Sequence, residues 1–191
     1  VGWIPESDVD VTDAPAAPPT QKAIFGFGGS NVSLTNLVSS SGVVATDTTG
    51  VGTGRATLAA SGYGTDKAIF GFGETSTEVS MTNLVSNSGV VATDTTGVGT
   101  ARRFLAAAGY GLDKAIFAYG YTSGVVSMSN LVNSSGVVSA DVSGVGTARR
   151  YSSAAGYGDD KAIFGYGSTG SNVSLTNLVS NTGVVSADVT G

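Results

Sequence analysis

Apolar and polar residues alternate along most of the chain, in short stretches that end at glycines. In the stretch 67–73, KAIFGFG, every second residue falls on the same face of an extended strand, which puts Ala68, Phe70 and Phe72 together. The stretch 79–85, VSMTNLV, alternates in the same way. A period of two, with β-branched and aromatic residues between glycine-rich breaks, predicts short antiparallel strands.

One unit of about 47 residues returns four times after the first 21 residues. KAIF opens each unit, at 22–28, 67–73, 114–120 and 161–167. A second element close to VSLTNLV follows at 32–38, 79–85, 126–132 and 173–179. A third element, GVVATD or GVVSAD, follows at 42–47, 89–94, 136–141 and 183–188. A fixed period of this size indicates a propeller, solenoid or array, because one unit cannot bury its apolar face alone.

A fourth element lies between the units, at 54–64, 101–111 and 148–158. The copy ARRFLAAAGYG contains good helix formers, so a helix and a strand are both considered. Its short length and its Gly-Tyr-Gly ending favour a strand. Only three copies exist, which leaves the first unit without this strand. The predicted repeats are approximately 22–53, 54–100, 101–147 and 148–191.

The order of elements within a unit resembles a blade of a kelch-type β-propeller, in the order RRFLAAAGYGLDKAIFAYG, VVSMSNLV, GVVSADV, GVGTAR. The resemblance covers residues 22–191 and implies an all-β fold of four kelch-like four-stranded blades. The glycine pair of the kelch family is replaced here by Gly-Phe-Gly or Gly-Tyr-Gly, and its late-strand tryptophan is absent. The repeat is also similar to repeat proteins of phages and environmental bacteria, which implies a virion fibre or an extracellular surface component.

Residues 1–21 differ in composition from the rest of the chain. They hold all four prolines and the only tryptophan, so we expect an extended, semi-rigid arm. The arm contains the alternating stretch ESDVDVTDA, which is suited to pairing with a sheet edge. We expect the arm, or the arm of a neighbouring chain, to complete the first blade. The candidate assembly residues of the arm are Trp3, Ile4, Val9 and Val11.

The composition excludes several classes of function. The chain has no cysteine and no histidine, so it lacks thiolate ligands, disulfides and the commonest general base. A net charge of −5 gives no basic field to attract nucleic acid. No apolar run reaches the length of a membrane-spanning helix, so we expect no membrane insertion. We therefore expect no catalytic residues, no metal site, no cofactor and no enzyme activity.

Two sets of charged residues recur with the repeat. Arginines begin the fourth element and aspartates end the third, a few residues earlier, so we predict structural Arg–carboxylate pairs between blades. They are Arg55, Arg102 and Arg149, with Asp47, Asp94 and Asp141. A ligand held by the arginines is the functional alternative. In Asp-Lys at 66–67 and 113–114 and Asp-Asp-Lys at 159–161, the aspartates are predicted to lie in a turn and the lysines on the solvated strand face, rather than to form a ring of ligands.

The loops between the first two elements of each unit vary, while their flanks barely change. They read GSN at 29–31, ETSTE at 74–78, YTSGV at 121–125 and STGSN at 168–172. Scaffold positions must repeat in order to stack, whereas loop tips are free to diverge and often bind partners. Neutral drift of surface loops explains the same pattern. The candidate binding residues are Glu74, Thr75, Glu78, Tyr121, Thr122, Ser168 and Thr169.

These patterns predict a structural subunit of an extracellular filament, fibre or virion appendage, located outside the cell or on a virion surface. The alternative is a module that binds a glycan or protein receptor through the variable loops. For the structural subunit we expect a homo-oligomer or filament, whereas the binding module should stay discrete and be stabilised by its ligand.

Overall fold

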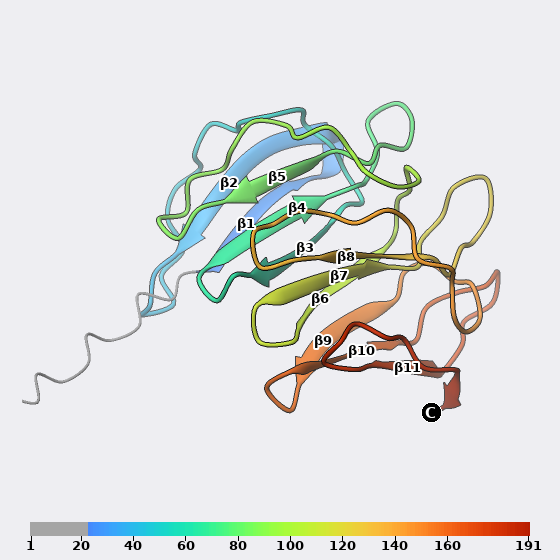
Figure 1. Ribbon diagram of the computed structural model, residues 1–191. Coiled ribbons are helices and arrows are strands. Elements are labelled where there is room, and N and C mark those ends of the chain that lie inside the picture. The colour runs from blue at the N-terminus through green and yellow to red at the C-terminus, as the bar shows by residue number, and fades with distance from the viewer. Residues whose placement is uncertain (1–22) are drawn as a thin grey trace, which may run out of the picture.

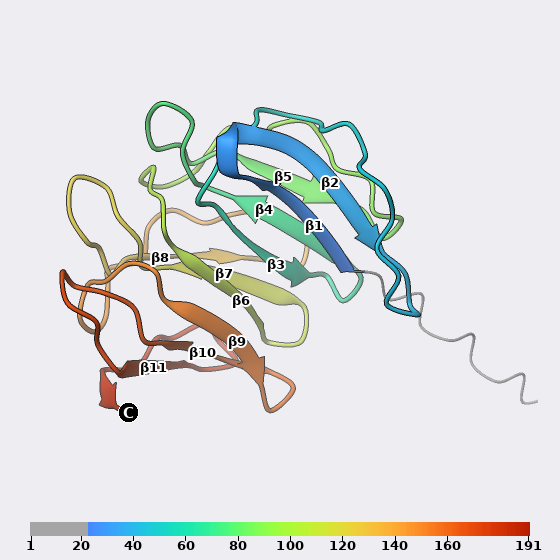
Figure 2. The ribbon, with the colours of Figure 1, turned by 180° about the vertical axis from the view of Figure 1, so that it is seen from behind.

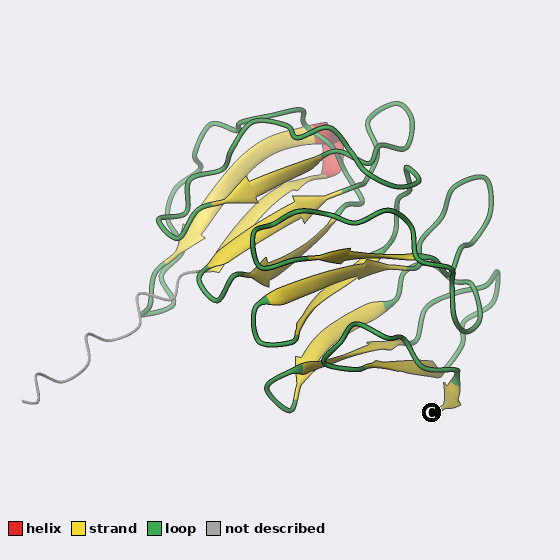
Figure 3. Cartoon of the chain, in the orientation of Figure 1, coloured by secondary structure: helices red, strands yellow, loops and turns green. Residues whose placement is uncertain are grey.

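The regular structure of the protein is almost entirely β-strand. The computed structural model describes residues 23–191, and its one helical segment is a short 3-10 turn, Gly29–Asn31, between the first two strands (Figure 3). The prediction of an all-β fold is therefore confirmed. The fold of the predicted arm, including Trp3, Ile4, Val9 and Val11, lies outside the described residues.

The strands form four small antiparallel sheets, and each sheet corresponds to one sequence repeat. The first sheet contains β1 (Ala23–Gly28) and β2 (Val32–Val38). The second contains β3 (Ala59–Tyr63), β4 (Lys67–Gly71) and β5 (Thr82–Val85). The third contains β6 (Ala106–Tyr110), β7 (Lys114–Ala118) and β8 (Ser129–Val132). The fourth contains β9 (Ser153–Tyr157), β10 (Lys161–Gly165), β11 (Leu175–Val179) and β12 (Val189–Thr190).

The element between the units is a strand, and the helical alternative is wrong. β3, β6 and β9 each pair antiparallel with the following KAIF strand over five residues. Their small residues allow two sheets to approach closely. A Cβ added at Gly156 would lie 3.4 Å from the carbonyl oxygen of Gly109 in the preceding sheet. Tertiary packing therefore outweighs the helix propensity of the alanines.

The third sequence element forms less regular structure than predicted. It runs beside the second element in every repeat, but in the first three repeats it pairs only through isolated bridges. In the first repeat these bridges are Val38 to Val44 and Thr35 to Thr48. The bridged positions are three residues apart on one strand and four apart on the other, so one extra residue forms a bulge and interrupts the ladder. The fourth strand is assigned only in the last repeat, as β12.

The four sheets follow one another in series. Figures 1 and 2 show the first sheet at one end of the molecule and the last sheet at the other, with the remaining two between them. Contacts between strands of neighbouring sheets are concentrated where β3, β6 and β9 lie side by side. None of the four sheets closes on itself within residues 23–191.

The first sheet lacks the strand that opens the other three. In the described part of the chain β1 pairs with β2 alone, whereas β4, β7 and β10 each have a strand on both sides. This agrees with the three copies of the fourth sequence element. Among residues 23–191, no strand therefore pairs with the backbone groups on the edge of β1 that its counterparts use for pairing.

The core consists of three apolar layers, one between each pair of neighbouring sheets. Aromatic rings from the two sheets meet in every layer, with centroid distances of 5.1 Å for Phe27–Phe70, 5.2 Å for Phe72–Phe117 and 5.5 Å for Tyr119–Phe164. Phe117 is fully buried, whereas Phe25, at the same position of the first repeat, is 63% exposed. A sheet of this size is thus buried only by its neighbours.

Replacing Phe117 by alanine should lower the free energy of unfolding by about 3–5 kcal/mol, because a fully buried ring is lost and leaves a cavity. Phe25→Ala provides the matched control at the same repeat position, with an expected loss below about 1 kcal/mol. Urea unfolding of both variants at low protein concentration measures the difference. Equal losses would contradict the stacked core.

Candidate functional site

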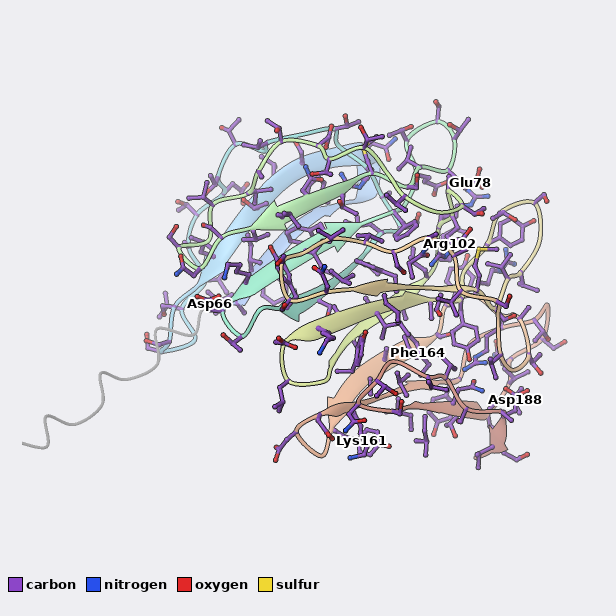
Figure 4. All side chains as sticks on the ribbon, in the orientation of Figure 1. Asp66, Glu78, Arg102, Lys161, Phe164 and Asp188 are labelled. Atoms are coloured by element: carbon purple, nitrogen blue, oxygen red, sulfur yellow. The ribbon has the colours of Figure 1, made fainter. Side chains whose placement is uncertain are left out.

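The charged residues labelled in Figure 4 include two pairs that lie on opposite edges of the stack. Glu78 and Asp188 lie on the edge that carries the variable loops, whereas Asp66 and Lys161 lie on the edge that carries the tight turns. Phe164 lies between the edges, among the sheets.

An arginine is buried between successive sheets, near the loop edge. Arg102 is fully buried, and its Nε donates to the carbonyl oxygen of Tyr119 at 3.0 Å. Its Nη1 donates to the Thr100 carbonyl at 3.2 Å, and its guanidinium carbon lies 4.2 Å from the ring centroid of Phe72. Tyr119 belongs to the same repeat as Arg102, and Phe72 belongs to the preceding one. Arg102 therefore connects two sheets through a ring face and backbone carbonyls.

The same arrangement occurs at the other two arginines. Arg55 lies over Phe27 at 4.5 Å and donates to the Phe72 carbonyl at 2.8 Å. Arg149 lies over Tyr119 at 3.9 Å and donates to the Tyr166 carbonyl at 2.9 Å. The predicted role of these arginines between repeats agrees with this geometry. Their burial leaves no open side for a ligand.

The predicted partners of the arginines are wrong. Arg55 lies 3.9 Å from Asp94, and the same distance separates Arg102 from Asp141 and Arg149 from Asp188. Each partner is thus the aspartate of the arginine's own repeat rather than the one a few residues earlier. The reason is that the third element folds back beside its own sheet. Asp47 contacts Asn36, with Nδ2 to Oδ1 at 2.8 Å, and its pairing with Arg55 does not occur.

The three paired aspartates hold the segment that joins two repeats. The backbone N–H and Oγ1 of Thr100 donate to Oδ2 of Asp141 at 3.0 and 2.7 Å, and Nδ2 of Asn130 donates to Oδ1 at 2.9 Å. The preceding Gly99 has a φ of 85°, and a Cβ there would lie 2.5 Å from Asp141. Glycine is therefore required in the GVGT sequence, because a side chain at this position would prevent the segment between the repeats from reaching the carboxylate of Asp141.

Burial and charge shift the pKa values within this network. Burial lowers the pKa of Arg55 and Arg102 to about 10, although the charges of Asp94 and Asp141 oppose the shift. Burial raises the pKa of Asp141, but hydrogen bonds from Thr100 and Asn130 and the charge of Arg102 outweigh it, so its pKa is lowered overall. At neutral pH both groups are therefore charged.

The variable loops are joined by a second arginine that the sequence analysis did not single out. Arg103 forms ion pairs with Glu74 and with Glu78, the latter at 3.2 Å. Its guanidinium also lies 5.5 Å from the ring centroid of Tyr121 and 4.9 Å from that of Phe104. Three predicted binding residues therefore lie around one cation. The double arginine in ARRF and ARRY is the sequence signal that points to it.

The contacts continue into the fourth repeat. Arg150 lies 4.9 Å from the ring centroid of Tyr121 and 5.2 Å from that of Tyr151. Acidic, cationic and aromatic side chains thus alternate along the loop edge from the second repeat to the fourth. This contact series stabilises the stack and also neutralises the carboxylates that a ligand would meet.

The loop tips of the second, third and fourth repeats share one conformation despite their different sequences, whereas the first loop, Gly29–Asn31, is a 3-10 turn. In each of these loops a threonine N–H donates to the backbone carbonyl oxygen two residues later: Thr75 to Thr77, Thr122 to Gly124 and Thr169 to Ser171. Ser168 accepts a further hydrogen bond at Oγ from the N–H of Gly170, at 3.2 Å. Of the remaining predicted binding residues, Thr75, Thr122 and Ser168 are therefore partly buried turn residues, and Thr169 is exposed to solvent.

A surface hollow of about 430 Å³ lies beside the loop of the second repeat. Its lining includes Glu78, Met81, Asp94 and Ala101. It is the structural feature that most favours ligand binding at the variable loops, because a carboxylate and apolar atoms line the same space.

On the opposite edge, the aspartate of each Asp-Lys pair lies in a turn and the lysine begins the following strand. Nζ of Lys67, Lys114 and Lys161 lies 2.7, 3.1 and 2.7 Å from Oδ1 of the aspartate that precedes it. The charges are therefore paired within each turn. A smaller hollow of about 270 Å³ lies between two of these turns, lined by Tyr63, Lys67, Tyr110 and Lys114 among others.

Residues 23–191 contain no group of histidine, cysteine or acidic side chains arranged to hold a metal ion. They also contain no helix with the length and hydropathy needed to cross a bilayer. No model of a known protein family matches the chain, and no curated protein sequence is significantly similar to it.

Replacing Asp141 by asparagine should destabilise the fold by about 1–3 kcal/mol near pH 7, because hydrogen bonds to a charge are lost and an amide N–H₂ faces other donors. The folded pKa of Asp141 lies below its usual value of 3.8. The stabilisation by the carboxylate is therefore present above that value and is lost as the pH falls through the folded pKa.

Urea unfolding between pH 2 and pH 7 checks both statements, and the difference from wild type should shrink below about pH 4. Asp47→Asn is the matched control, because this aspartate contacts Asn36 but not an arginine. A loss at Asp47 as large as that at Asp141 would contradict a role of the carboxylate in holding the linker.

Proposed function

We propose that the protein is a non-enzymatic structural subunit of an extracellular filament, fibre or virion appendage. The observation that carries this proposal is the construction of the stack itself. Successive sheets meet through the same residue positions three times, and backbone hydrogen bonds cross from sheet to sheet. Such a one-dimensional arrangement is suited to extension by further units of the same kind.

The backbone contacts support a rigid, repeating unit. Three glycine N–H groups donate to backbone carbonyl oxygens of arginines in the following repeat, at 2.9–3.1 Å. The pairs are Gly28 with Arg55, Gly73 with Arg102 and Gly120 with Arg149. The backbone N–H of Phe104 donates to the carbonyl oxygen of Thr57, and the N–H of Tyr151 donates to the carbonyl oxygen of Phe104, both at 3.0 Å. Each repeat is therefore fixed in register relative to its neighbours, as a load-bearing or spacing element requires.

We further propose that the sheets are kelch-like blades. The close approach of β3, β6 and β9 at one edge supports a fan of blades about an axis, in which the outer strands diverge. Four blades then make up either a small ring or an arc of a larger one. The free edge of β1 supports completion of the first blade by a donated strand, for which residues 1–21 of the same or a neighbouring chain are our candidate.

A second candidate function is recognition of a glycan or protein receptor at the variable loops. The hollow beside Glu78 favours it. The charge pairing of Glu74 and Glu78 with Arg103 weighs against it, because these carboxylates already have a partner. The structural role therefore remains our first proposal.

Sedimentation velocity and negative-stain electron microscopy of the purified chain test the structural role. We expect particles that grow with concentration and show a regular repeat. A monomer at all concentrations, combined with a thermal shift on addition of a glycan or protein receptor, would favour the binding module instead.

Deleting residues 1–21 tests the donated strand separately. Because the edge of β1 would lose its proposed partner, we expect smaller assemblies and a lower melting temperature. Unchanged particle size and melting temperature would remove the arm from the assembly.

A further inference from the structure

Every interface between neighbouring sheets is built from two complementary sets of positions. The face toward the following repeat, which we call the trailing face, carries a tyrosine, an isoleucine, an aromatic residue and a leucine. In the third sheet these are Tyr110, Ile116, Tyr119 and Leu131. The face toward the preceding repeat, the leading face, carries an alanine, a phenylalanine and two valines. In the fourth sheet these are Ala162, Phe164, Val179 and Val185.

The interface between the second and third sheets repeats this composition. Its trailing face contributes Tyr63, Ile69, Phe72 and Leu84, and its leading face contributes Ala115, Phe117, Val132 and Val138. The interface between the first and second sheets uses Ile24 and Phe27 on one side and Phe70, Val85 and Val91 on the other. The two faces thus fit each other at three separate places in one chain.

One leading face and one trailing face are left uncovered at the ends of the stack. On the first sheet, Phe25 is 63% and Val44 55% exposed, whereas Phe70 and Val91, at the same positions of the next repeat, are 3% and 8% exposed. On the fourth sheet the exposed fractions of Tyr157, Tyr166 and Leu178 are 41%, 61% and 42%.

The counterparts of these C-terminal residues are covered in the repeat before. Tyr110 and Tyr119 are 4% and 0% exposed, because the fourth sheet lies on them. The two ends of the stack therefore carry the two complementary sets of residues that meet at each interface inside the chain.

From this complementarity we infer that a second copy of the chain binds head to tail, with its leading face on the trailing face of the first. In the joined pair Tyr166 of one copy meets Phe25 of the next, as Tyr119 meets Phe164 within the chain. The inference deepens the proposed structural function, on which it rests, by naming the surface through which the subunits assemble.

The shape of the leading face agrees with this arrangement. A Cβ added at Gly89, Gly136 or Gly183 would lie 2.4–2.9 Å from Leu37, Leu84 or Leu131 of the preceding sheet. Gly42, at the same position of the first repeat, has no atom within 4 Å of its added Cβ. The space over Gly42 is thus open and matches the exposed Leu178 of another copy.

The junction differs from the internal interfaces in one respect. Within the chain a buried arginine lies on each trailing aromatic ring, 3.9–4.5 Å from its centroid. The first repeat has no arginine at that position, and residues 1–21 contain neither arginine nor lysine. The junction consequently lacks the cation–π contact, and we expect it to be reversible and concentration-dependent.

Charged substitutions at the two ends test the interface. Phe25→Asp blocks the leading face, and Tyr166→Asp blocks the trailing face. Both positions are more than half exposed, so the folded monomer should tolerate them, which thermal unfolding at low concentration verifies. Val90→Asp is the matched control, because Val90 is 64% exposed but belongs to the third sequence element of the second repeat, away from both end faces.

Sedimentation velocity gives the expected pattern. Wild type and Val90→Asp should associate, and each end variant alone should remain monomeric. An equimolar mixture of Phe25→Asp and Tyr166→Asp should form dimers and nothing larger, because one intact leading face and one intact trailing face remain. Association of either end variant like wild type, or a mixture that stays monomeric, would overturn the inference.

The same experiment separates the inference from the proposed function. Small closed rings of wild type that both end variants dissociate would support the interface and contradict the filament. Filaments that persist in both end variants would support the structural function and overturn this interface. A wild-type chain that is monomeric at all concentrations would overturn both.

Discussion

A charged guanidinium buried between two sheets is the interaction on which the rest of the structure depends. Arg102 has no exposed surface, and its nearest carboxylate oxygen is 3.9 Å away. The cost of removing its charge from water appears as a pKa lowered to about 10. Carbonyl oxygens of its own sheet and the ring face of the preceding sheet offset that cost. Because the two sets of partners belong to different repeats, the charge can be accommodated only when the sheets are stacked.

This dependence explains the roles of the residues around it. Asp141 is held beside the arginine by Thr100 and Asn130, and Gly99 leaves the room for that approach. The linker between repeats, the arginine and the edge of the sheet therefore form one polar network. On the outer edge, Arg103 and Arg150 join neighbouring loops in a similar way, through carboxylates and rings. Loops that vary in sequence are thus still bound to the scaffold.

Much of the fold could be predicted because its signals are local. The alternation in KAIFGFG and the glycines at the turns predict the strands, and the copy number of ARRFLAAAGYG identifies the sheet with one strand fewer among residues 23–191. The alternation is wrong for Phe72, which follows the end of β4 with a φ of 62° and packs with Ile69 on the face opposite to Phe70. The partner of each arginine could not be predicted, since Asp94 comes close to Arg55 only after the third element has folded back. The exposure of Phe25 could not be read from the repeat either, because its sequence context equals that of buried Phe70 and only its place at the end of the stack differs. How successive sheets are arranged depends on the angle between them, which a period along the chain does not encode.

A double-mutant cycle between Arg102 and Phe72 tests most directly whether the buried arginine joins one sheet to the next. The cycle compares Arg102→Met, Phe72→Leu and the double variant by urea unfolding at neutral pH. If the guanidinium stabilises the stack through the ring of the preceding sheet, the two changes should be coupled by about 1–2 kcal/mol, as expected for a desolvated cation–π contact. If the stability losses of the two single variants add up to the loss of the double variant within about 0.5 kcal/mol, the arginine does not join the sheets through this ring, and the account is contradicted.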